Sequence, residues 1–250
     1  KDSFYAKSRV MNEDDILNRA GEMLKEGADI LDVGGYSSRP GAKEVPIKEE
    51  IGLTSYAIEL IKSHFPDALI SIDTFRSEVA EAAMRAGATI VNDISAGTLD
   101  PKMVDFITAN QVPYIAMHMR GNPENMHKMT KYTHIIPEIL FYFSQLIERL
   151  KDKGHTDLII DPGFGFAKTT EQNFEILGNL ELFKNLESII LVGLSRKSMI
   201  YKTLKTDPSE ALNGTTVLNT LALAKGADIL RVHDVRPAVE AIKLTIKTLT

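Results

Sequence analysis

The feature that most constrains the fold is a step from apolar to polar residues that recurs seven times along the chain. The last step is typical, because the apolar run 227–230 is followed directly by Arg231, Val232, His233 and Asp234. Six earlier apolar runs end in the same way, at residues 32–35, 73–74, 92–93, 118–120, 161–163 and 195–197. One such step can be accidental, whereas seven indicate an architecture whose strands all deliver polar side chains to one functional rim.

Helical sequence follows each of these apolar runs. Periodicity and terminal glycine or proline residues predict strands at 28–33, 68–73, 89–92, 112–117, 157–161, 188–193 and 227–230. The same signals predict helices at 13–25, 47–65, 79–85, 99–109, 135–153, 170–177 and 208–225, and a last helix that opens at Arg236 and Pro237. Asn12 and Ser77 are the expected caps of the first and third helices. Such alternation with short connections predicts parallel strands joined by right-handed crossovers.

The fold class that fits this order best is α/β, as a (β/α)8 TIM barrel in one domain over residues 1–250. A barrel needs eight strands, and the chain opens with a polar loop that leads into a helix. We therefore expect the first strand to lie upstream of Lys1. The alternative is an open, doubly wound sheet of seven strands. That sheet would gather its polar residues at one switch point, whereas here they follow every strand.

Composition narrows the range of functions. Of 250 residues, 44% are hydrophobic and 25% are charged, which is ordinary for a globular protein with a sizeable core. The net charge of -5 argues against a nucleic-acid partner. The absence of cysteine excludes disulfides, thiolate metal sites and a cysteine nucleophile. No apolar run approaches the roughly 18 residues of a membrane helix. The first residues do not read as a signal peptide, so we expect a cytoplasmic enzyme without a membrane partner.

The polar residues of the rim combine acceptors, cations, imidazoles and hydroxyls. They are Asp32, Asp73, Asn92 and Asp161; Arg39, Arg196, Lys197 and Arg231; His118 and His233; and Ser38 and Ser195. This mixture suits a ligand with a hydrogen-bonding ring and an anionic tail. It does not suit a metal hydrolase, since no closely spaced pair of histidines is present. The chain also lacks a nucleophile elbow and a nucleotide-binding P-loop.

Each of these residues also has a structural interpretation. For Asp93 we favour the cap of the following helix, and Asp73 is explained equally well as the cap of a turn. Arg196 and Lys197 are equally typical of a solvated helix start. For His118, two roles stay open: it is either a residue of the site or a residue that supports the site. Surface positions are expected for His64, His127, His134 and His155. The functional case therefore depends on the conjunction of the rim residues.

Several stretches resemble one known family. They are Asp2-Ser3-Phe4, Asp32-Val33-Gly34-Gly35, Ser38-Arg39-Pro40-Gly41, Asp161-Pro162-Gly163-Phe164-Gly165-Phe166, Ser195-Arg196-Lys197-Ser198 and Arg231-Val232-His233-Asp234. Taken in order, they resemble dihydropteroate synthase over essentially the whole chain. The resemblance implies an eight-stranded barrel that joins 4-aminobenzoate to 6-hydroxymethyl-7,8-dihydropterin diphosphate and releases diphosphate. It further implies assistance by Mg²⁺ and competition by sulfonamide inhibitors.

The resemblance also assigns roles to residues. Asp161, Lys197, Arg231 and His233 are the implied catalytic residues. Asp161 would bind the donor-rich edge of the pterin, with Lys197 on its acceptor side and Asp73 and Asn92 in its plane. Arg231 and His233 would hold the diphosphate, near Asp32. The family's Mg²⁺-linked asparagine has no counterpart here and is expected upstream of Lys1, so no metal ligand is assigned.

The second substrate would be bound by a separate set of residues. By resemblance, the 4-aminobenzoate site comprises Phe4, Ser38, Arg39, Pro40, Phe166 and Ser195. We expect a dissociative mechanism, because diphosphate is a good leaving group and the pterin stabilises the cation that remains. A homodimer is expected through outer helices, for which apolar Ile200, Tyr201 and Leu204 are candidates that core packing explains as readily.

Two other functions remain open at this point. A methyltetrahydrofolate-dependent methyltransferase would share Asp73, Asn92 and Asp161, but would not need the residues assigned to an aromatic second substrate. A non-catalytic folate-binding barrel would keep the residues of the ring pocket but lose those that bind the anion. Arg231 and His233 are both present, which argues against that second function.

Overall fold

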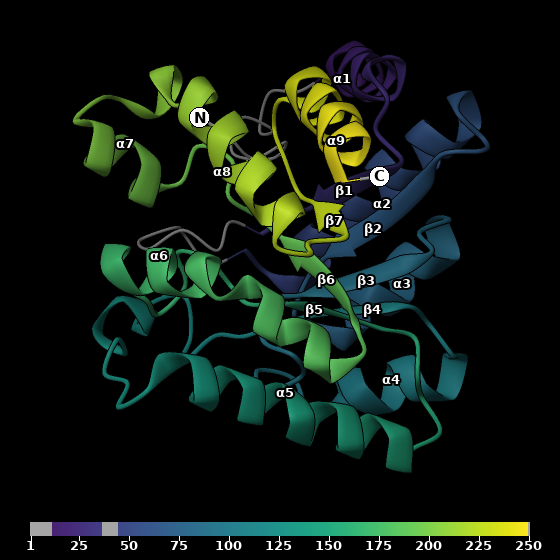
Figure 1. The fold of residues 1–250 in the computed structure, drawn as a ribbon. Coiled ribbons are helices and arrows are strands. Elements are labelled where there is room, and N and C mark those ends of the chain that lie inside the picture. The colour runs from purple at the N-terminus through teal and green to yellow at the C-terminus, as the bar shows by residue number, and fades with distance from the viewer. Residues whose placement is uncertain (1–11, 37–44, 250) are drawn as a thin grey trace. The chain divides into compact units, whose positions relative to one another are not determined.

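The computed structural model describes residues 12–36 and 45–249, whose helices and strands are drawn in Figure 1. These residues form two compact units. The first unit holds the described residues up to Ala116 together with Lys153–Asp157. The second holds Met117–Asp152 and the described residues from Leu158 onward. The expectation of a single domain over residues 1–250 stays a prediction.

The first unit alternates helices and parallel strands. Its elements are α1 (Glu13–Glu26), β1 (Ile30–Gly34), α2 (Ile47–His64), β2 (Leu69–Asp73), α3 (Ser77–Ala86), β3 (Ile90–Asp93), α4 (Lys102–Asn110) and β4 (Tyr114–Met117), whose last residue lies in the second unit. The strands pair in chain order from β1 to β4. Gly34 pairs with Asp73, and Asp73 pairs with Asn92. The carboxyl ends of these strands therefore lie at the same level.

The second unit repeats the alternation. Its elements are α5 (Ile135–Asp152), β5 (Leu158–Asp161), α6 (Thr170–Gly178), β6 (Ile189–Val192), α7 (Ser198–Leu204), α8 (Leu212–Ala224), β7 (Ile229–Leu230) and α9 (Val235–Leu249), with short 3-10 helices at Met126–Lys128, Leu180–Leu186 and Pro208–Glu210. The strands β5, β6 and β7 pair in parallel. The short β7 brings Arg231 to β6, because the Arg231 backbone N–H donates to the Val192 carbonyl at 2.9 Å.

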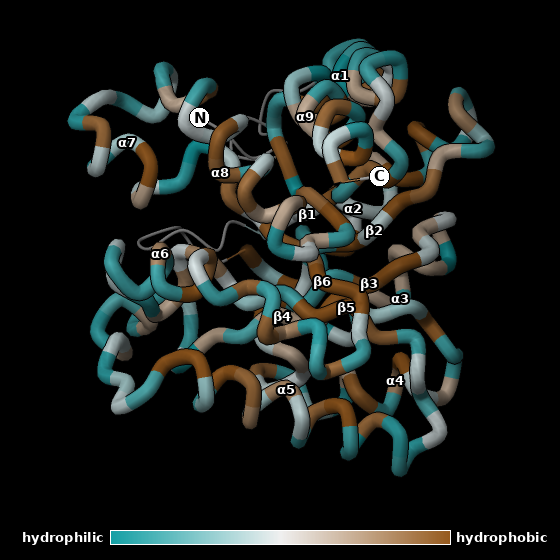
Figure 2. The backbone as a smooth tube through the Cα atoms, viewed as in Figure 1, coloured by the Kyte–Doolittle hydropathy of each residue, from teal (hydrophilic) through white to brown (hydrophobic). Residues whose placement is uncertain are grey.

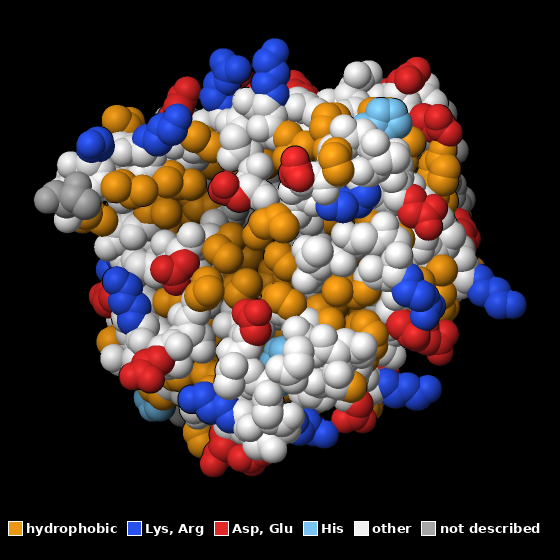
Figure 3. Space-filling view, turned by 90° about the vertical axis from the view of Figure 1, so that its right-hand side faces the viewer, with side chains coloured by type: hydrophobic (Ala, Val, Ile, Leu, Met, Phe, Trp, Pro, Cys, Tyr) orange, Lys and Arg blue, Asp and Glu red, His pale blue; other side chains and the backbone are white. Residues whose placement is uncertain are grey.

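The strands form the core of each unit. Every residue of β3, β4 and β5 is buried, as expected for parallel strands covered on both faces. Figure 2 shows these strands as hydrophobic segments, while hydrophilic residues alternate with hydrophobic ones along the helices. Exposed apolar side chains also occur, and Figure 3 shows one face on which they gather between charged side chains.

The predicted strands are all present, whereas some helix ends differ. Asn12 caps α1 as predicted, since its side chain accepts from the Asp15 N–H at 2.9 Å. Ser77 is not a cap, because it is the first residue of α3 and its backbone N–H donates to Asp100 at 2.7 Å. The helix predicted over 208–225 is also wrong at its start. It begins with a 3-10 turn at Pro208–Glu210, and α8 starts only at Leu212.

Candidate functional site

In the first unit, the predicted rim residues Asp32 and Asn92 come into direct contact. The carboxylate of Asp32 accepts from the Ser71 hydroxyl at 2.6 Å and from the Asn92 amide at 3.3 Å. Strand register explains the contact with Ser71, because Asp32 pairs with Ser71 and their side chains share one face. Asp73 packs beside Gly34, where an added Cβ would lie 3.2 Å from the Asp73 Cβ. This part of the rim is a set of hydrogen-bond acceptors and one amide.

Asp93 is buried, and its carboxylate holds the loop after β3 by hydrogen bonds. Its predicted role as a helix cap is therefore wrong. It accepts from the Ser95 N–H and hydroxyl at 2.7 Å each, from the Gly97 N–H at 2.8 Å and from the Tyr114 hydroxyl at 2.7 Å. Burial raises the pKa of this carboxyl. The four hydrogen-bond donors act in the opposite direction, because they stabilise the charged form. At the start of α4, Asp100 instead accepts from the Lys102 N–H at 3.0 Å.

A second buried acid of the first unit was not predicted. Glu50 of α2 is fully buried, accepts from Thr74 at 2.9 Å and forms an ion pair with Arg76 at 2.7 Å. Arg76 also donates to the Val45 carbonyl at 2.7 Å and lies 5.3 Å from the Tyr36 ring centroid. Burial raises the pKa of Glu50 against the opposing effects of Thr74 and Arg76. This pair fixes the segment that follows Asp73.

In the second unit, Asp161 lies at the end of β5 and is 6% exposed. Its carboxylate accepts from the Gly163 N–H at 2.7 Å. Burial raises the pKa of Asp161, while Lys197, the Gly163 N–H, Arg231 and Lys168 oppose that rise by favouring the charged form. A buried carboxylate with cations nearby can accept hydrogen bonds from a neutral ligand that has several donors.

Lys197 and Arg231 lie together beside this carboxylate. A Cβ placed on Gly193 would lie 3.8 Å from the Lys197 Nζ and 3.9 Å from the Arg231 Cβ. Lys197 donates to the Phe164 carbonyl, and its Nζ lies 5.0 Å from the centre of the Phe166 ring. Burial lowers the pKa of Lys197 to about 8, helped by Arg231 and opposed by Asp161. Lys197 is thus no solvated helix start, although α7 does begin directly after it.

Lys168 is a buried cation that the sequence analysis missed. Its Nζ donates to the carbonyls of Gly163 and Phe166 at 2.9 Å each and of His118 at 3.2 Å. It also lies 3.1 Å from the His118 Nδ1. Burial lowers the pKa of Lys168 to about 7, and burial with Lys168 and Arg120 nearby lowers that of His118 to about 2. His118 is therefore a neutral supporting residue, and Lys168 holds the loop that follows Asp161.

The segments after β6 and β7 are joined by two adjacent pairs. The Ser195 Oγ lies 2.9 Å from the His233 Nδ1 and accepts from the His233 backbone N–H at 3.2 Å. The neighbouring Arg196 forms a two-pronged ion pair with Asp234, at 2.8 and 3.0 Å. The rim residues of these two segments are therefore held in a fixed arrangement.

Some predicted residues lie elsewhere. Phe4, Ser38, Arg39 and Pro40 lie outside the described residues. His64, His127 and His134 are exposed as predicted. His155 is not, because it is 1% exposed and, in the described part of the chain, neither of its ring nitrogens has a hydrogen-bond partner. Within the described part of the chain, no helix is long and apolar enough to cross a membrane.

Comparison with known proteins identifies relatives over nearly the whole chain. Residues 1–233 match the family model described as pterin binding enzyme. The dihydropteroate synthase of Synechocystis sp. is 42% identical over 246 residues, which cover 97% of this chain and 85% of the relative. The dihydropteroate synthase of Escherichia coli is 39% identical over 238 residues, which cover 94% of this chain and 84% of the relative.

Solved structures agree with these relatives. A Yersinia pestis dihydropteroate synthase in a sulfonamide drug complex matches with a TM-score of 0.93 and 35% identity, over 99% of this chain and 90% of that one. The Thermus thermophilus enzyme in complex with 4-aminobenzoate matches with a TM-score of 0.86 and 36% identity, over 92% of this chain and 88% of that one. With the parallel strands and intervening helices, these matches confirm the predicted α/β class of TIM-barrel type.

Proposed function

Since the chain belongs to the pterin binding enzyme family, among the dihydropteroate synthases, we propose that it condenses 4-aminobenzoate with 6-hydroxymethyl-7,8-dihydropterin diphosphate. The products are 7,8-dihydropteroate and diphosphate, so the chain is a transferase of folate biosynthesis. The observation that carries this function is the similarity to dihydropteroate synthases over 97% of the chain. The cluster of Asp161, Lys197 and Arg231 supports it, because it combines a ring-binding carboxylate with cations for an anionic tail.

For the pterin, we propose that Asp161 accepts two parallel hydrogen bonds from the 2-amino and N3 groups. Charge-assisted bonds of this kind are stronger than neutral ones, and the buried position of Asp161 keeps water from competing. Lys197 would donate to the acceptor side of the ring. Asp32, Asp73 and Asn92, which the resemblance assigns to the pterin, are kept as further proposed ligands. Their acceptors and single amide suit a ring with both donors and acceptors.

For the diphosphate, we propose Arg231 and His233, together with the start of α9. The Arg231 side chain is exposed at the end of β7, where an anion can reach it. Helix α9 has 15 residues, and the positive end of its dipole, at the first turn, favours an anion. Pro237 is its third residue, an early helical position as predicted.

We propose a dissociative mechanism that needs no strong base. The bond between the methylene carbon and the diphosphate oxygen breaks first, and the electron pair leaves with the diphosphate. The pterin ring stabilises the methylene cation. The aminobenzoate nitrogen, unprotonated at neutral pH, then attacks this carbon and loses its proton to water. Arg231 and His233 would act by neutralising the leaving group, while the ring-binding residues hold the cation in position.

For 4-aminobenzoate, the proposed residues are those that the resemblance assigns. Phe166 is half-buried, and its ring lies against Lys197. Ser195 is buried, and its hydroxyl contacts His233. Phe4, Ser38, Arg39 and Pro40 complete the proposed set. Sulfonamide inhibitors would compete for the same residues, since the related Yersinia pestis enzyme has been solved in a complex with such a drug.

Mg²⁺ is proposed as the metal that assists diphosphate release. Among the described residues, no group of three histidine or acidic side chains could hold a metal by itself. Mg²⁺, however, often binds through one or two carboxylates and the phosphates of a substrate, and keeps several waters. Asp32, with the Ser71 hydroxyl beside its carboxylate, has hard oxygen donors of the required kind. When bound, the metal would neutralise negative charge on the diphosphate.

A diphosphate-release assay tests the function directly. With the pterin diphosphate as the first substrate, release is expected only when 4-aminobenzoate is added, and dihydropteroate should form in equal amount. Equal release without 4-aminobenzoate would contradict the proposed condensation. Methyl transfer from methyltetrahydrofolate, without diphosphate release, would instead indicate the methyltransferase.

The pH dependence of catalysis should report the protonation of Lys197. Its ammonium must be charged to balance Asp161 and to give the ring a charge-assisted hydrogen bond, and its pKa is lowered to about 8. We therefore expect kcat/KM to fall about tenfold per pH unit above about pH 8. In the Lys197→Arg variant, whose guanidinium stays charged, this fall should be absent even though the overall rate is lower. A wild-type profile that is flat to about pH 10 would contradict this role.

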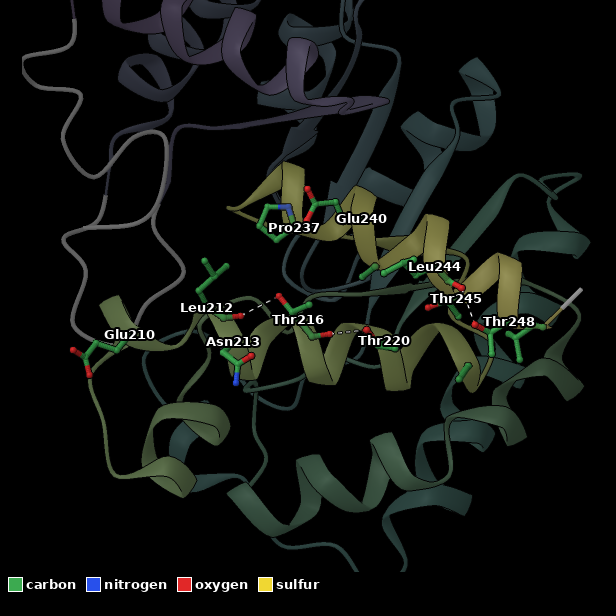
Figure 4. A pocket seen from close by; sticks show the side chains of 13 residues that line it. Glu210, Leu212, Asn213, Thr216, Thr220, Pro237, Glu240, Leu244, Thr245 and Thr248 are labelled. Atoms are coloured by element: carbon green, nitrogen blue, oxygen red, sulfur yellow. Dashed lines mark hydrogen bonds between the residues drawn. The ribbon is translucent and has the colours of Figure 1, made fainter.

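We propose that the chain forms a homodimer through α8 and α9. These helices border a groove of about 750 Å³, and Figure 4 shows Thr216 and Thr220 on one side of it and Glu240, Leu244 and Thr248 on the other. The hydroxyls of Thr216, Thr220 and Thr248 bond to carbonyls of their own helices. Thr245 also lines the groove, and its buried hydroxyl has no hydrogen-bond partner among the described residues. Exposed apolar side chains on these helices are Val217, Leu221, Leu244, Ile246 and Leu249. A second copy of the same self-complementary face is the proposed occupant.

The dimer proposal predicts the effect of one charged substitution. Leu244 is 70% exposed, so Leu244→Asp should preserve the fold of the monomer and place a charge in the interface. Light scattering after gel filtration should give the mass of a dimer for the wild type and of a monomer for this variant. The matched control is Leu182→Asp, an exposed leucine outside α8 and α9, which should remain dimeric. Of the candidates named from the sequence, Ile200 is 2% exposed and belongs to the core, whereas Leu204 is exposed.

The cytoplasmic location expected from the sequence is also kept as a proposal. Cell fractionation with an antibody to this chain would test it. Recovery of the protein mainly in the membrane or secreted fraction would contradict it.

A further inference from the structure

Ser195 and His233 form a contact whose chemistry goes beyond the role assigned to either residue. Ser195 is 6% exposed and stands shortly after the end of β6. Two nitrogens of His233 approach its Oγ, the backbone N at 3.2 Å and the ring Nδ1 at 2.9 Å. Both distances lie within hydrogen-bond range, so the hydroxyl is bound twice by the same residue.

The number of protons available limits how this contact can be made. A serine hydroxyl has one proton and two lone pairs, whereas a backbone N–H can only donate. The His233 backbone N–H therefore takes one lone pair of the Ser195 Oγ. The remaining bond to Nδ1 has two possible directions. Either the Ser195 proton is donated to a bare Nδ1, or a protonated Nδ1 donates to the second lone pair.

The surroundings of Ser195 favour the first direction. Among the described residues, the Ser195 hydroxyl has no acceptor within hydrogen-bond distance other than the His233 Nδ1. If Nδ1 carried the proton of a neutral ring, the buried Ser195 O–H would be left without an acceptor. Buried polar hydrogens are rarely left unpaired, because an unmade bond costs more than an average bond contributes.

We propose that Ser195 is a positioning residue that keeps the proton of neutral His233 on Nε2 and so makes the ring a hydrogen-bond donor to the substrate diphosphate. In the opposite tautomer, Nε2 would carry a lone pair and repel a phosphate oxygen. A protonated ring also donates from Nε2, so His233 is a donor in both charge states. This inference rests on the proposed function for the identity of the anion, but not for the tautomer.

The adjacent ion pair between Arg196 and Asp234 keeps Ser195 and His233 in contact. Arg196 and Asp234 directly follow Ser195 and His233, and they bond through two nitrogens and both carboxylate oxygens. The Arg196 backbone N–H also donates to the Thr215 hydroxyl at 3.0 Å. Since two successive residues on each segment are paired, the His233 ring cannot easily turn away from Ser195. The pairing thus acts on ring orientation as well as on the tautomer.

A consequence concerns the second substrate. The single proton of Ser195 is used by His233, so Ser195 cannot also donate to the carboxylate of 4-aminobenzoate without releasing the ring. We therefore move Ser195 from the 4-aminobenzoate residues, where the resemblance placed it, to the residues that act on the diphosphate. Its substitution should affect the pterin diphosphate rather than 4-aminobenzoate.

The tautomer can be observed directly by NMR. The full chain, labelled with ¹⁵N at histidine, would be studied without ligands at about pH 8.5, where an ordinary imidazole is neutral. Long-range ¹H–¹⁵N correlation separates protonated from bare ring nitrogens, and the His233→Gln variant identifies the signals of His233. We expect Nε2 protonated and Nδ1 bare in the wild type. A protonated Nδ1 there would overturn the proposal, whatever the enzyme's activity.

Variants of Ser195 add two measurements, the tautomer of His233 and the KM for each substrate, which a purely structural role of Ser195 would not change. Ser195→Ala should give a mixture of tautomers and raise the KM for pterin diphosphate about tenfold, with little change in the KM for 4-aminobenzoate. Ser195→Thr keeps the hydroxyl and should restore both the tautomer and the KM. Ser144→Ala, which removes an exposed hydroxyl on α5, is the matched control and should change neither.

The outcomes are distinguishable from failure of the proposed function. A rise in the KM for 4-aminobenzoate alone would overturn the placement of Ser195 with the diphosphate. Absence of any condensation in the wild type would reject the proposed function, while the NMR result would still decide the tautomer. If Ser195→Ala does not fold, the wild-type and Ser195→Thr spectra carry the test.

Discussion

Replacing Asp161 with asparagine is expected to lower kcat/KM by about 100-fold or more with the fold retained. The amide has nearly the same shape and can still accept from the Gly163 N–H, as Asp161 does at 2.7 Å. It would, however, present a donor where the pterin edge also donates. It would also remove the negative charge that balances the nearby Lys197 and Arg231. Steady-state kinetics with both substrates varied would measure the loss.

The control for this substitution is Asp228→Asn. Asp228 also accepts from a backbone N–H, that of Ile190 at 2.8 Å, but it lies before β7 rather than after it. Its kcat/KM should stay within about threefold of the wild type, a change typical of residues outside the site. Equal effects of the two substitutions, or unchanged kinetics for Asp161→Asn, would contradict the assignment of the pterin ligand.

Replacing Gly163 with alanine should have the largest effect on stability. A Cβ on Gly163 would lie 2.1 Å from the His118 carbonyl oxygen, and the φ angle of this residue is +74°. Because the clash is with backbone, no side-chain rotation can relieve it. We expect a loss of about 3 kcal/mol or more in the free energy of unfolding, together with the loss of activity. Urea unfolding monitored by circular dichroism would measure it.

Gly154→Ala is a matched control that separates backbone strain from the clash. Gly154 has nearly the same φ, +73°, but a Cβ there would meet nothing within 4 Å. Its substitution should cost only about 1 kcal/mol, the strain of a left-handed residue. If the two variants lose the same free energy of unfolding, then close packing of the loop on His118 is not what stabilises it.

The strands and much of the rim were predictable from sequence because their signals are local. An apolar run that ends in Asp161 or Asp32 reads directly as a buried strand with a polar end. The glycine and proline residues after the strands marked where loops begin. The contact of Asp32 with Ser71 and Asn92 then follows from parallel register, which places strand ends side by side.

Other features depend on partners that no local pattern reveals. Lys168 reads as an ordinary exposed lysine, and it is buried because the carbonyls of His118, Gly163 and Phe166 surround its Nζ. Glu50 has the appearance of a favourable acid in the first turn of a helix, yet it is buried against Arg76. The position of Lys168 next to the glycine-rich stretch was the only available signal.

The pairing of Ser195 with His233 is of the same kind. The two residues are 38 positions apart, and each was predicted for the rim on its own. The sequence therefore identified both residues of the contact, but it did not show that they bond to each other. Only the paired strands β6 and β7 bring the two segments together.

The central claim is that the second unit holds a pterin diphosphate by both of its chemically different ends. Isothermal titration calorimetry of the wild type and Arg231→Ala, with the pterin diphosphate and with the same pterin lacking diphosphate, tests it most directly. We expect Arg231→Ala to weaken binding of the diphosphate compound at least about tenfold and to leave the affinity for the bare pterin unchanged. Equal affinity of the two proteins for the diphosphate compound would contradict the claim.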